Sequence, residues 1–167
     1  PKISAVTAID GGDISSPLGN IHPRNKQALG ARLASAMWRS LKGVYGVEGP
    51  AVKGTVYNAT TGMIQLTFHE DPLAPIQPTL DIQPAICPNG VDPSFCVGFE
   101  VQFSDNSWRS ANPVVVNSGY GIWLSFATPA GTSPVRVRYA WSPWPLASLF
   151  DSKGFPGWPF DRQLTQA

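Results

Sequence analysis

Residues 3–9, Ile-Ser-Ala-Val-Thr-Ala-Ile, are the stretch that decides the fold. They are small or apolar and show no alternating polar face, which predicts a strand buried on both sides in a parallel sheet. Residues 10–23 hold three glycines and two prolines and predict a loop. In residues 24–42 apolar side chains recur at steps of three and four, which predicts an amphipathic helix that ends at Gly43. Residues 1–46 are therefore expected to be the strand–loop–helix end of an α/β domain.

Residues 47–167 have the texture of an all-β domain. Residues 52–57 and 63–68 flank a short turn and predict a β-hairpin. Further strands are expected at residues 96–103, 114–116, 121–127 and 135–140. Because these strands are short and separated by turn residues, we expect an antiparallel β-sandwich or jelly-roll. Residues 71–94 are expected to form a long surface loop, and residues 141–167 an irregular tail.

Composition excludes several classes of protein. Hydrophobic residues make up 43% of the 167 residues and charged residues 14%, which argues against a disordered chain. The net charge is +1 and there is no run of Lys or Arg, so nucleic acid is not an expected partner. No apolar stretch approaches the roughly 20 residues of a membrane span. The two histidines, His22 and His69, lack metal-ligand spacing to the cysteines, so we expect no metal.

Cys87 and Cys96 lie nine positions apart in a segment rich in Pro, Gly and Asp. We expect them to form a loop-closing disulfide in an oxidising compartment, the alternative being two free thiols in a cytosolic loop. The tripeptide Asn58-Ala-Thr is an acceptor for N-glycosylation and agrees with a secretory origin. The chain opens at Pro1 directly into the apolar run, and we expect more protein to precede it.

His22 is the residue most informative about chemistry. It follows the predicted parallel strand and precedes the helix, at the edge of the sheet where ligands bind in α/β domains. An imidazole there can act as a general base near neutral pH, although a loop histidine can also simply cap a helix. Asp10, Asp13 and Asn20 are close enough in sequence to orient the ring, or to form turn hydrogen bonds instead. The chain contains no Gly-x-Ser-x-Gly or Gly-Asp-Ser pattern, so it offers a base without its nucleophile.

A second interpretation is a glycan-binding or structural module with no activity of its own. It rests on a basic and aromatic cluster near the end of the chain that could stack on sugar rings or could pack the domain interior. The cluster consists of Arg136, Arg138, Tyr139, Trp141 and Trp144.

Two blocks of sequence resemble a known family. Residues 16–27 read Ser-Pro-Leu-Gly-Asn-Ile-His-Pro-Arg-Asn-Lys-Gln, between the 5–13 segment and Gly-Ala-Arg-Leu at 30–33. This region is similar to the histidine block of sialate O-acetylesterases, which belong to the SGNH-type hydrolases. Residues 135–141, Val-Arg-Val-Arg-Tyr-Ala-Trp, and residues 155–160, Phe-Pro-Gly-Trp-Pro-Phe, resemble the family's closing signatures.

The resemblance implies an activity and a missing component. Residues 1–46 would be the C-terminal part of an SGNH-type α/β/α hydrolase domain, and residues 47–167 an accessory β-domain. The enzyme would remove acetyl esters from sugar hydroxyls, with O-acetylated sialic acids as the leading substrate, and would use no cofactor. The nucleophilic serine would lie on an upstream portion or on the N-terminal chain of the same precursor. Animal members of the family are secreted or lysosomal, and some are cleaved into two chains.

By the same resemblance, His22 would take the proton of that serine. Many SGNH hydrolases carry an Asp three residues before this His, whereas here that position is Gly19. Three arrangements therefore stay open: a Ser–His dyad, orientation of the ring by Asp13 or Asn20, or orientation by a group from the missing portion.

Overall fold

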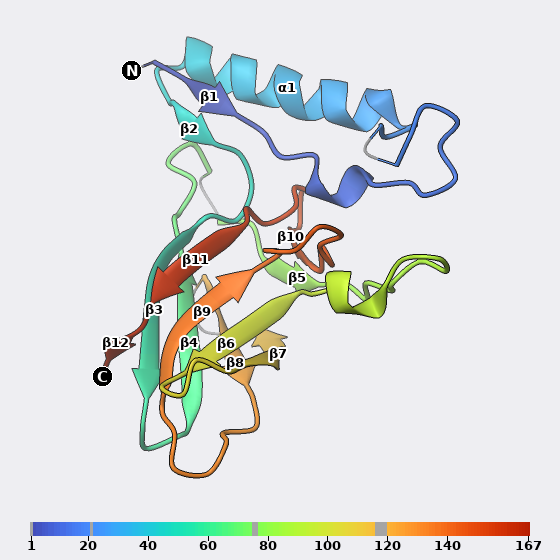
Figure 1. The fold of residues 1–167 in the computed structure, drawn as a ribbon. Coiled ribbons are helices and arrows are strands. Elements are labelled where there is room, and N and C mark those ends of the chain that lie inside the picture. Colours follow the sequence, from blue (N-terminus) through green and yellow to red (C-terminus); the bar gives the residue numbers. More distant parts are fainter. Residues whose placement is uncertain (1, 21, 75–76, 116–119) are drawn as a thin grey trace.

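The computed structural model describes residues 2–20, 22–74, 77–115 and 120–167 (Figure 1). The N-terminal part contains β1 (Ser4–Ala5), a 3-10 turn η1 (Ile9–Gly11), α1 (Lys26–Leu41) and β2 (Gly46–Val47). The helix begins where the Asn25 side chain accepts a hydrogen bond from the Ala28 amide at 3.0 Å. It ends before Gly43, which adopts a positive φ of 78°. The predicted helix at 24–42 is therefore confirmed.

The predicted strand at residues 3–9 is much shorter than expected. β1 spans two residues, is half-buried, and pairs in parallel with β2 through Ser4–Gly46 and Ala5–Val47. α1 covers one side of this pair (Figure 1). Within the described residues no other strand pairs with β1, so the backbone lacks the partners needed to continue the ladder. The prediction of a strand buried on both sides is thus wrong for the chain as described.

Eight strands of the remaining chain form one hydrogen-bonded sheet. They are β3 (Val52–Asn58), β4 (Met63–Phe68), β6 (Phe99–Phe103), β7 (Trp108–Val115), β8 (Gly121–Ser125), β9 (Pro134–Tyr139), β11 (Phe160–Gln163) and β12 (Thr165–Gln166). Their order is β11-β9-β6-β7-β8-β4-β3-β12, and every pair is antiparallel except β12–β3. The hairpin and the antiparallel β-rich character are confirmed. The pairing differs from a two-sheet sandwich because a single series joins all eight strands.

The last segment of the chain brings the two edges of this sheet together. β11 pairs with β9 at one edge, and β12, one residue further on, pairs with β3 at the other. The Thr55 hydroxyl donates to the Gln163 carbonyl at 2.9 Å, and the Thr165 hydroxyl donates to the Thr55 carbonyl at 3.0 Å. The prediction of an irregular tail at 141–167 is therefore wrong for residues 149–151, 160–163 and 165–166, which form strands. Residue 116, the end of one predicted strand, and residues 75–76 of the predicted loop lie outside the described residues.

A small second sheet and a turn complete the β-domain. β5 (Leu80–Ile82) pairs antiparallel with β10 (Leu149–Asp151), and η2 (Pro93–Phe95) precedes β6. The core consists of inward-facing side chains at alternate positions of the strands, as the period of two requires. Its fully buried members include Ile64, Leu66, Val101, Phe103, Ile122, Leu124, Val137, Tyr139 and Leu149. The Tyr139 hydroxyl accepts a hydrogen bond from the Leu149 amide at 3.0 Å, so its polar atom is satisfied inside the core.

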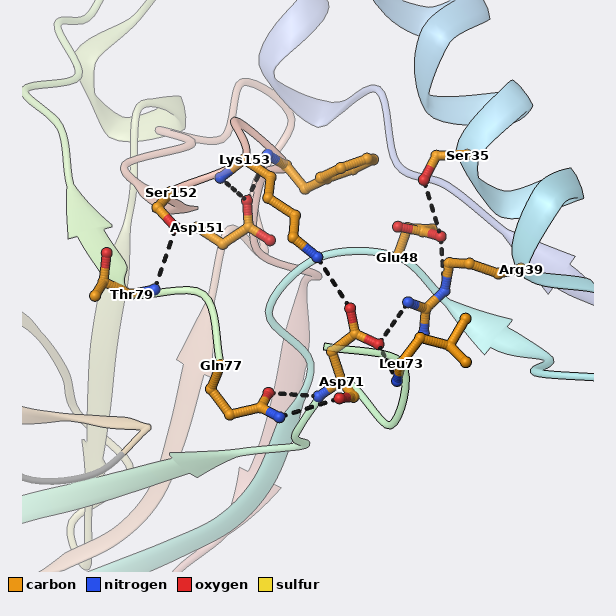
Figure 2. A network of polar contacts seen from close by, with 11 residues as sticks. Ser35, Arg39, Glu48, Asp71, Leu73, Gln77, Thr79, Asp151, Ser152 and Lys153 are labelled. Carbon is orange, nitrogen blue, oxygen red and sulfur yellow. Dashed lines mark hydrogen bonds and ion pairs between the residues drawn. The ribbon is translucent and has the colours of Figure 1, made fainter. Parts of the chain in front are cut away.

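A network of charges, largely shielded from solvent except at Lys153, joins α1 to the β-domain (Figure 2). Arg39 of α1 lies 2.8 Å from Glu48 and 2.6 Å from Asp71, and Lys153 lies 3.0 Å from Asp71. Burial raises the pKa of the Glu48 carboxyl, and Arg39 opposes it only in part. Burial alone would also raise the pKa of Asp71, but hydrogen bonds from Arg39, the Leu73 amide and Lys153 outweigh it and lower the pKa to about 2. Asp71 is thus held ionised.

Acid should weaken this junction through Asp71. Because its folded pKa is about 2 against an ordinary value of 3.8, its contribution to stability is complete above about pH 4 and is lost as the pH falls towards 2. The shift corresponds to about 2 kcal/mol. Glu48 and Asp151 have raised pKa values, so their protonation as the pH falls favours the folded state and opposes the effect of Asp71. The measurement is urea unfolding of wild type and Asp71→Asn between about pH 7 and 2. The stability gap between them should narrow below about pH 4, and a constant gap would contradict the assignment.

Candidate active site

His22 lies in a loop of consecutive turns between η1 and α1. The Asp13 amide donates to the Asn20 carbonyl at 3.0 Å, and the His22 amide donates to the Gly19 carbonyl at 3.0 Å. Gly19 adopts φ of 101°, a conformation that strains any other L-residue. The loop conformation therefore favours glycine at residue 19 over any other residue. The His22 side chain is exposed, and no hydrogen bond to its ring is found within the described residues.

Asp13 anchors this loop to the start of the helix. Its carboxylate accepts hydrogen bonds from the Ser15 amide at 2.9 Å and the Ser15 hydroxyl at 2.7 Å, and forms an ion pair with Arg24 at 2.7 Å. The Ser15 hydrogen bonds, followed by Arg24, lower the pKa of Asp13. The Arg24 guanidinium also donates to the Ser15 carbonyl. The structure thus connects Asp13 to Asn20 through the backbone, but it places neither side chain in a hydrogen bond with His22 among the described residues.

Asp10, in η1 at the start of the loop, is held by α1. Both of its carboxylate oxygens accept hydrogen bonds from Arg32 of α1 at 2.7 Å, in a bidentate arrangement. Arg32 also donates to the Thr7 carbonyl at 3.2 Å. Arg24, just before α1, and Arg32 within α1 therefore both hold the start of the His22 loop, through Asp13 and Asp10.

A cavity of about 600 Å³ adjoins the loop. It is bounded by residues 8–12 and Asn20 on one side, by residues 83–88 on a second side, and by residues 143–150 on a third. The Trp144 ring lies so close to Gly12 that a Cβ atom at that position would be 3.3 Å from the indole. Sequence reasoning identified the loop but missed the wall at 83–88. The only local sign of this wall was a Pro-rich segment closed by two cysteines.

The disulfide between Cys87 and Cys96 is present, which confirms the predicted pairing. It links the 83–88 wall to residues 95–97, and residues 144–146 lie alongside that segment. There the Trp144 amide donates to the Phe95 carbonyl at 3.3 Å and the Leu146 amide donates to the Val97 carbonyl at 3.0 Å. The disulfide therefore connects two walls of the same cavity.

The structure separates the predicted basic and aromatic cluster into unrelated environments. Tyr139 is fully buried in the core, and Arg136 pairs with Asp161. Arg138 lies 2.6 Å from Glu100, with its guanidinium over the Trp108 ring. Trp141 is 53% exposed, whereas Trp144 lines the cavity beside the His22 loop. Of the five, Trp144 alone joins the candidate site.

Asn58, the predicted glycosylation acceptor, ends β3 at the hairpin turn. Its side-chain oxygen accepts hydrogen bonds from the Thr60 amide at 2.9 Å and the Thr61 amide at 3.1 Å.

Over the described ranges, no helix has the length and apolarity to cross a membrane. In the same ranges, His, Cys, Asp and Glu side chains form no group of three able to hold a metal ion.

Comparisons with known proteins point to carbohydrate esterases. No protein-family model matches the chain. It is 30% identical over 173 residues to the sialate O-acetylesterase of Mus musculus, a match that covers 99% of this chain and 29% of the mouse protein. Its fold matches the crystal structure of a carbohydrate acetylesterase from Xanthomonas citri with a TM-score of 0.66 and 25% identity, covering 94% of this chain and 32% of that one. The chain thus spans about a third of the length of these relatives.

Proposed function

The chain belongs to the sialate O-acetylesterase family, and from this premise we propose that it is the histidine-bearing portion of a serine esterase that hydrolyses O-acetyl esters of sugars. The observation that carries the proposal is the exposed imidazole of His22 on a loop fixed by two ion pairs beside a cavity of about 600 Å³. O-acetylated sialic acid is the first substrate to test, because the mouse relative is named for it.

The proposed mechanism is acyl transfer in two steps. His22 takes the proton of a serine hydroxyl as the serine oxygen attacks the acetyl carbonyl carbon. The imidazolium then returns that proton to the sugar oxygen as the ester C–O bond breaks, which leaves an acetyl-serine. Water attacks this second ester with His22 again as base, releasing acetate and restoring the serine. These steps need a general base and a nucleophile and involve no cofactor.

The scheme also needs a residue that orients the His22 ring. Asp13 already accepts hydrogen bonds from Ser15 and pairs with Arg24, so its carboxylate is committed to holding the loop. Asn20 lines the cavity and lies two residues before His22, and no side-chain hydrogen bond commits it elsewhere among the described residues. We therefore favour Asn20, or a group from the serine-bearing portion, over Asp13 as the residue that positions the imidazole.

The serine would come from an upstream portion or the N-terminal chain of the same precursor. An apolar surface on the N-terminal part supports such a partner, because several of its large side chains are exposed to solvent where a globular protein normally buries them. They are Ile3 at 65%, Leu33 at 53%, Met37 at 68%, Trp38 at 55% and Leu41 at 77% exposure. In this scheme residues 1–46 complete the hydrolase domain of the partner and residues 47–167 form the accessory domain.

The experiment is acetate release from O-acetylated N-acetylneuraminic acid and from an O-acetylated neutral sugar by the natural full-length protein. A fluorophosphonate that labels activated serines, followed by peptide mapping, would locate the nucleophile. We expect acetate release and a labelled serine outside residues 1–167. Absence of both would remove the esterase proposal and leave the second candidate, a glycan-binding module, which the exposed Trp141 and the cavity beside Trp144 favour.

A secreted or lysosomal location is part of the proposal. The disulfide supports it, since such bonds persist in oxidising compartments. If the chain passes through a secretory pathway, Asn58 should carry an N-linked glycan, since it stands in a turn at the end of β3. Intact mass measured before and after enzymatic deglycosylation should fall in wild type and stay constant in Asn58→Gln. An unmodified Asn58 in protein from its native source would contradict this assignment.

A further inference from the structure

We propose that the cavity between the His22 loop and residues 143–150 binds an uncharged sugar ring, with Trp144 as its stacking platform. The proposal rests on the proposed function in one respect: it is the position beside His22 that makes this ring part of an esterase substrate. The conclusion that the bound ring is an uncharged sugar rests on the residues that line the cavity.

The size and the composition of the lining fit a monosaccharide. A volume of about 600 Å³ lies within the range of small-molecule sites, about 300–1,000 Å³. Amide groups are supplied by Asn20 and Gln83, and apolar surface by Ile86, Trp144 and Phe150. Sugars present hydroxyls at their edge and C–H bonds on their faces, so a site for them combines hydrogen-bonding groups with an aromatic face.

Trp144 is held firmly enough to serve as a platform. Its backbone amide donates to Phe95 at 3.3 Å, and its ring is in contact with Gly12 of the opposite wall. Further along the same segment, the Leu146 backbone amide donates to the Val97 carbonyl, and the Ser148 carbonyl accepts a hydrogen bond from the Gln83 backbone amide at 2.7 Å. A ring fixed before the ligand arrives costs less conformational entropy on binding than a free side chain does.

The charge of the lining argues against an anionic ring in this cavity. No lysine, arginine or histidine is found among the described residues that line it. Its one charged side chain is Asp10, whose two oxygens are both occupied by Arg32. A sugar carboxylate here would meet a carboxylate and no free cation, an arrangement that like-charge repulsion disfavours. An uncharged pyranose meets no such cost.

The test measures binding and turnover separately, in the natural full-length protein. With hydrolysis removed by His22→Ala, calorimetry would compare methyl galactopyranoside with the methyl glycoside of N-acetylneuraminic acid. We expect the neutral glycoside to bind, and Trp144→Ala to weaken its binding about tenfold or more. Trp141→Ala is the matched control, since Trp141 is exposed and is not among the lining residues; its binding should equal that of the parent.

A second variant keeps the test sharp if Trp144→Ala disturbs the fold. Gln83 is exposed at the rim of the cavity, and Gln83→Arg adds a cation without removing a core group. It should create binding of the anionic glycoside, and it should weaken but not abolish binding of the neutral one, because it removes one of the amide groups assigned to the sugar. Equal binding of the neutral glycoside to parent and Trp144→Ala, or binding of the anionic glycoside alone, would overturn the proposal. If the natural full-length protein without substitutions binds the neutral sugar but releases no acetate, that result would count against the esterase function and leave the cavity assignment standing.

Discussion

Under the proposed function, His22→Ala in the natural full-length protein is expected to lower kcat for acetate release by about 10⁴-fold or more. In the proposed mechanism the imidazole accepts the serine proton, and removal of a triad base in other serine hydrolases costs this much. KM should change little, because the ring takes part in proton transfer and not in holding the sugar. The measurement is steady-state acetate release across pH, with unfolding curves to confirm that the variant is folded.

His69→Ala is the matched control, since His69 is the other histidine of the chain and follows β4. Its turnover should equal that of wild type. Asn20→Ala tests the positioning role: it should lower kcat and displace the acidic limb of the pH–rate profile, a readout that simple loosening of the loop does not produce. Turnover by His22→Ala within a few-fold of wild type would exclude this residue from the mechanism.

Arg39→Met is expected to destabilise the protein by about 3–5 kcal/mol, the cost of leaving a buried carboxylate without its partner. Arg39 is 14% exposed and serves two acids at once, Glu48 at 8% and Asp71 at 15% exposure. Methionine keeps the aliphatic stem, so the effect isolates the charge. Tm should fall by about 10 °C or more for a chain of this size.

Arg136→Met is the control for this experiment. Arg136 also pairs with one aspartate, Asp161, but its side chain is 38% exposed and water can take over its role. Its Tm should change far less. A double variant, Arg39→Met with Glu48→Leu, should recover part of the loss, because it removes the buried carboxylate that Arg39→Met leaves without a cation, whereas Asp71 keeps Lys153. Equal Tm changes for Arg39→Met and Arg136→Met would show that the junction is not maintained by these charges.

Local sequence pattern was sufficient for the elements whose partners are close in the chain. The helix at 26–41, the 52–68 hairpin and the Cys87–Cys96 disulfide were all predicted, since each depends on spacing within about twenty residues. The histidine block was also recognisable, because its residues are contiguous. The family suggested by that block agrees with the similarity to the mouse and Xanthomonas citri proteins. Periodicity, turn residues and short motifs are the information that a linear sequence carries directly.

Only the tertiary structure decided what depends on distant segments. The tail was expected to be irregular, yet Thr165 pairs beside Val56 and Phe160 beside Tyr139, so the last residues join both edges of the sheet. The strand predicted at 3–9 is only two residues long, because among the described residues it pairs with β2 alone, which is itself two residues long. The cavity combines residues 8–20, 83–88 and 143–150, which no local pattern relates. Hydrogen bonds and cavities of this kind are set by the path of the whole chain. For that reason the sequence could identify His22 as the candidate base, while only the fold could show what surrounds its loop.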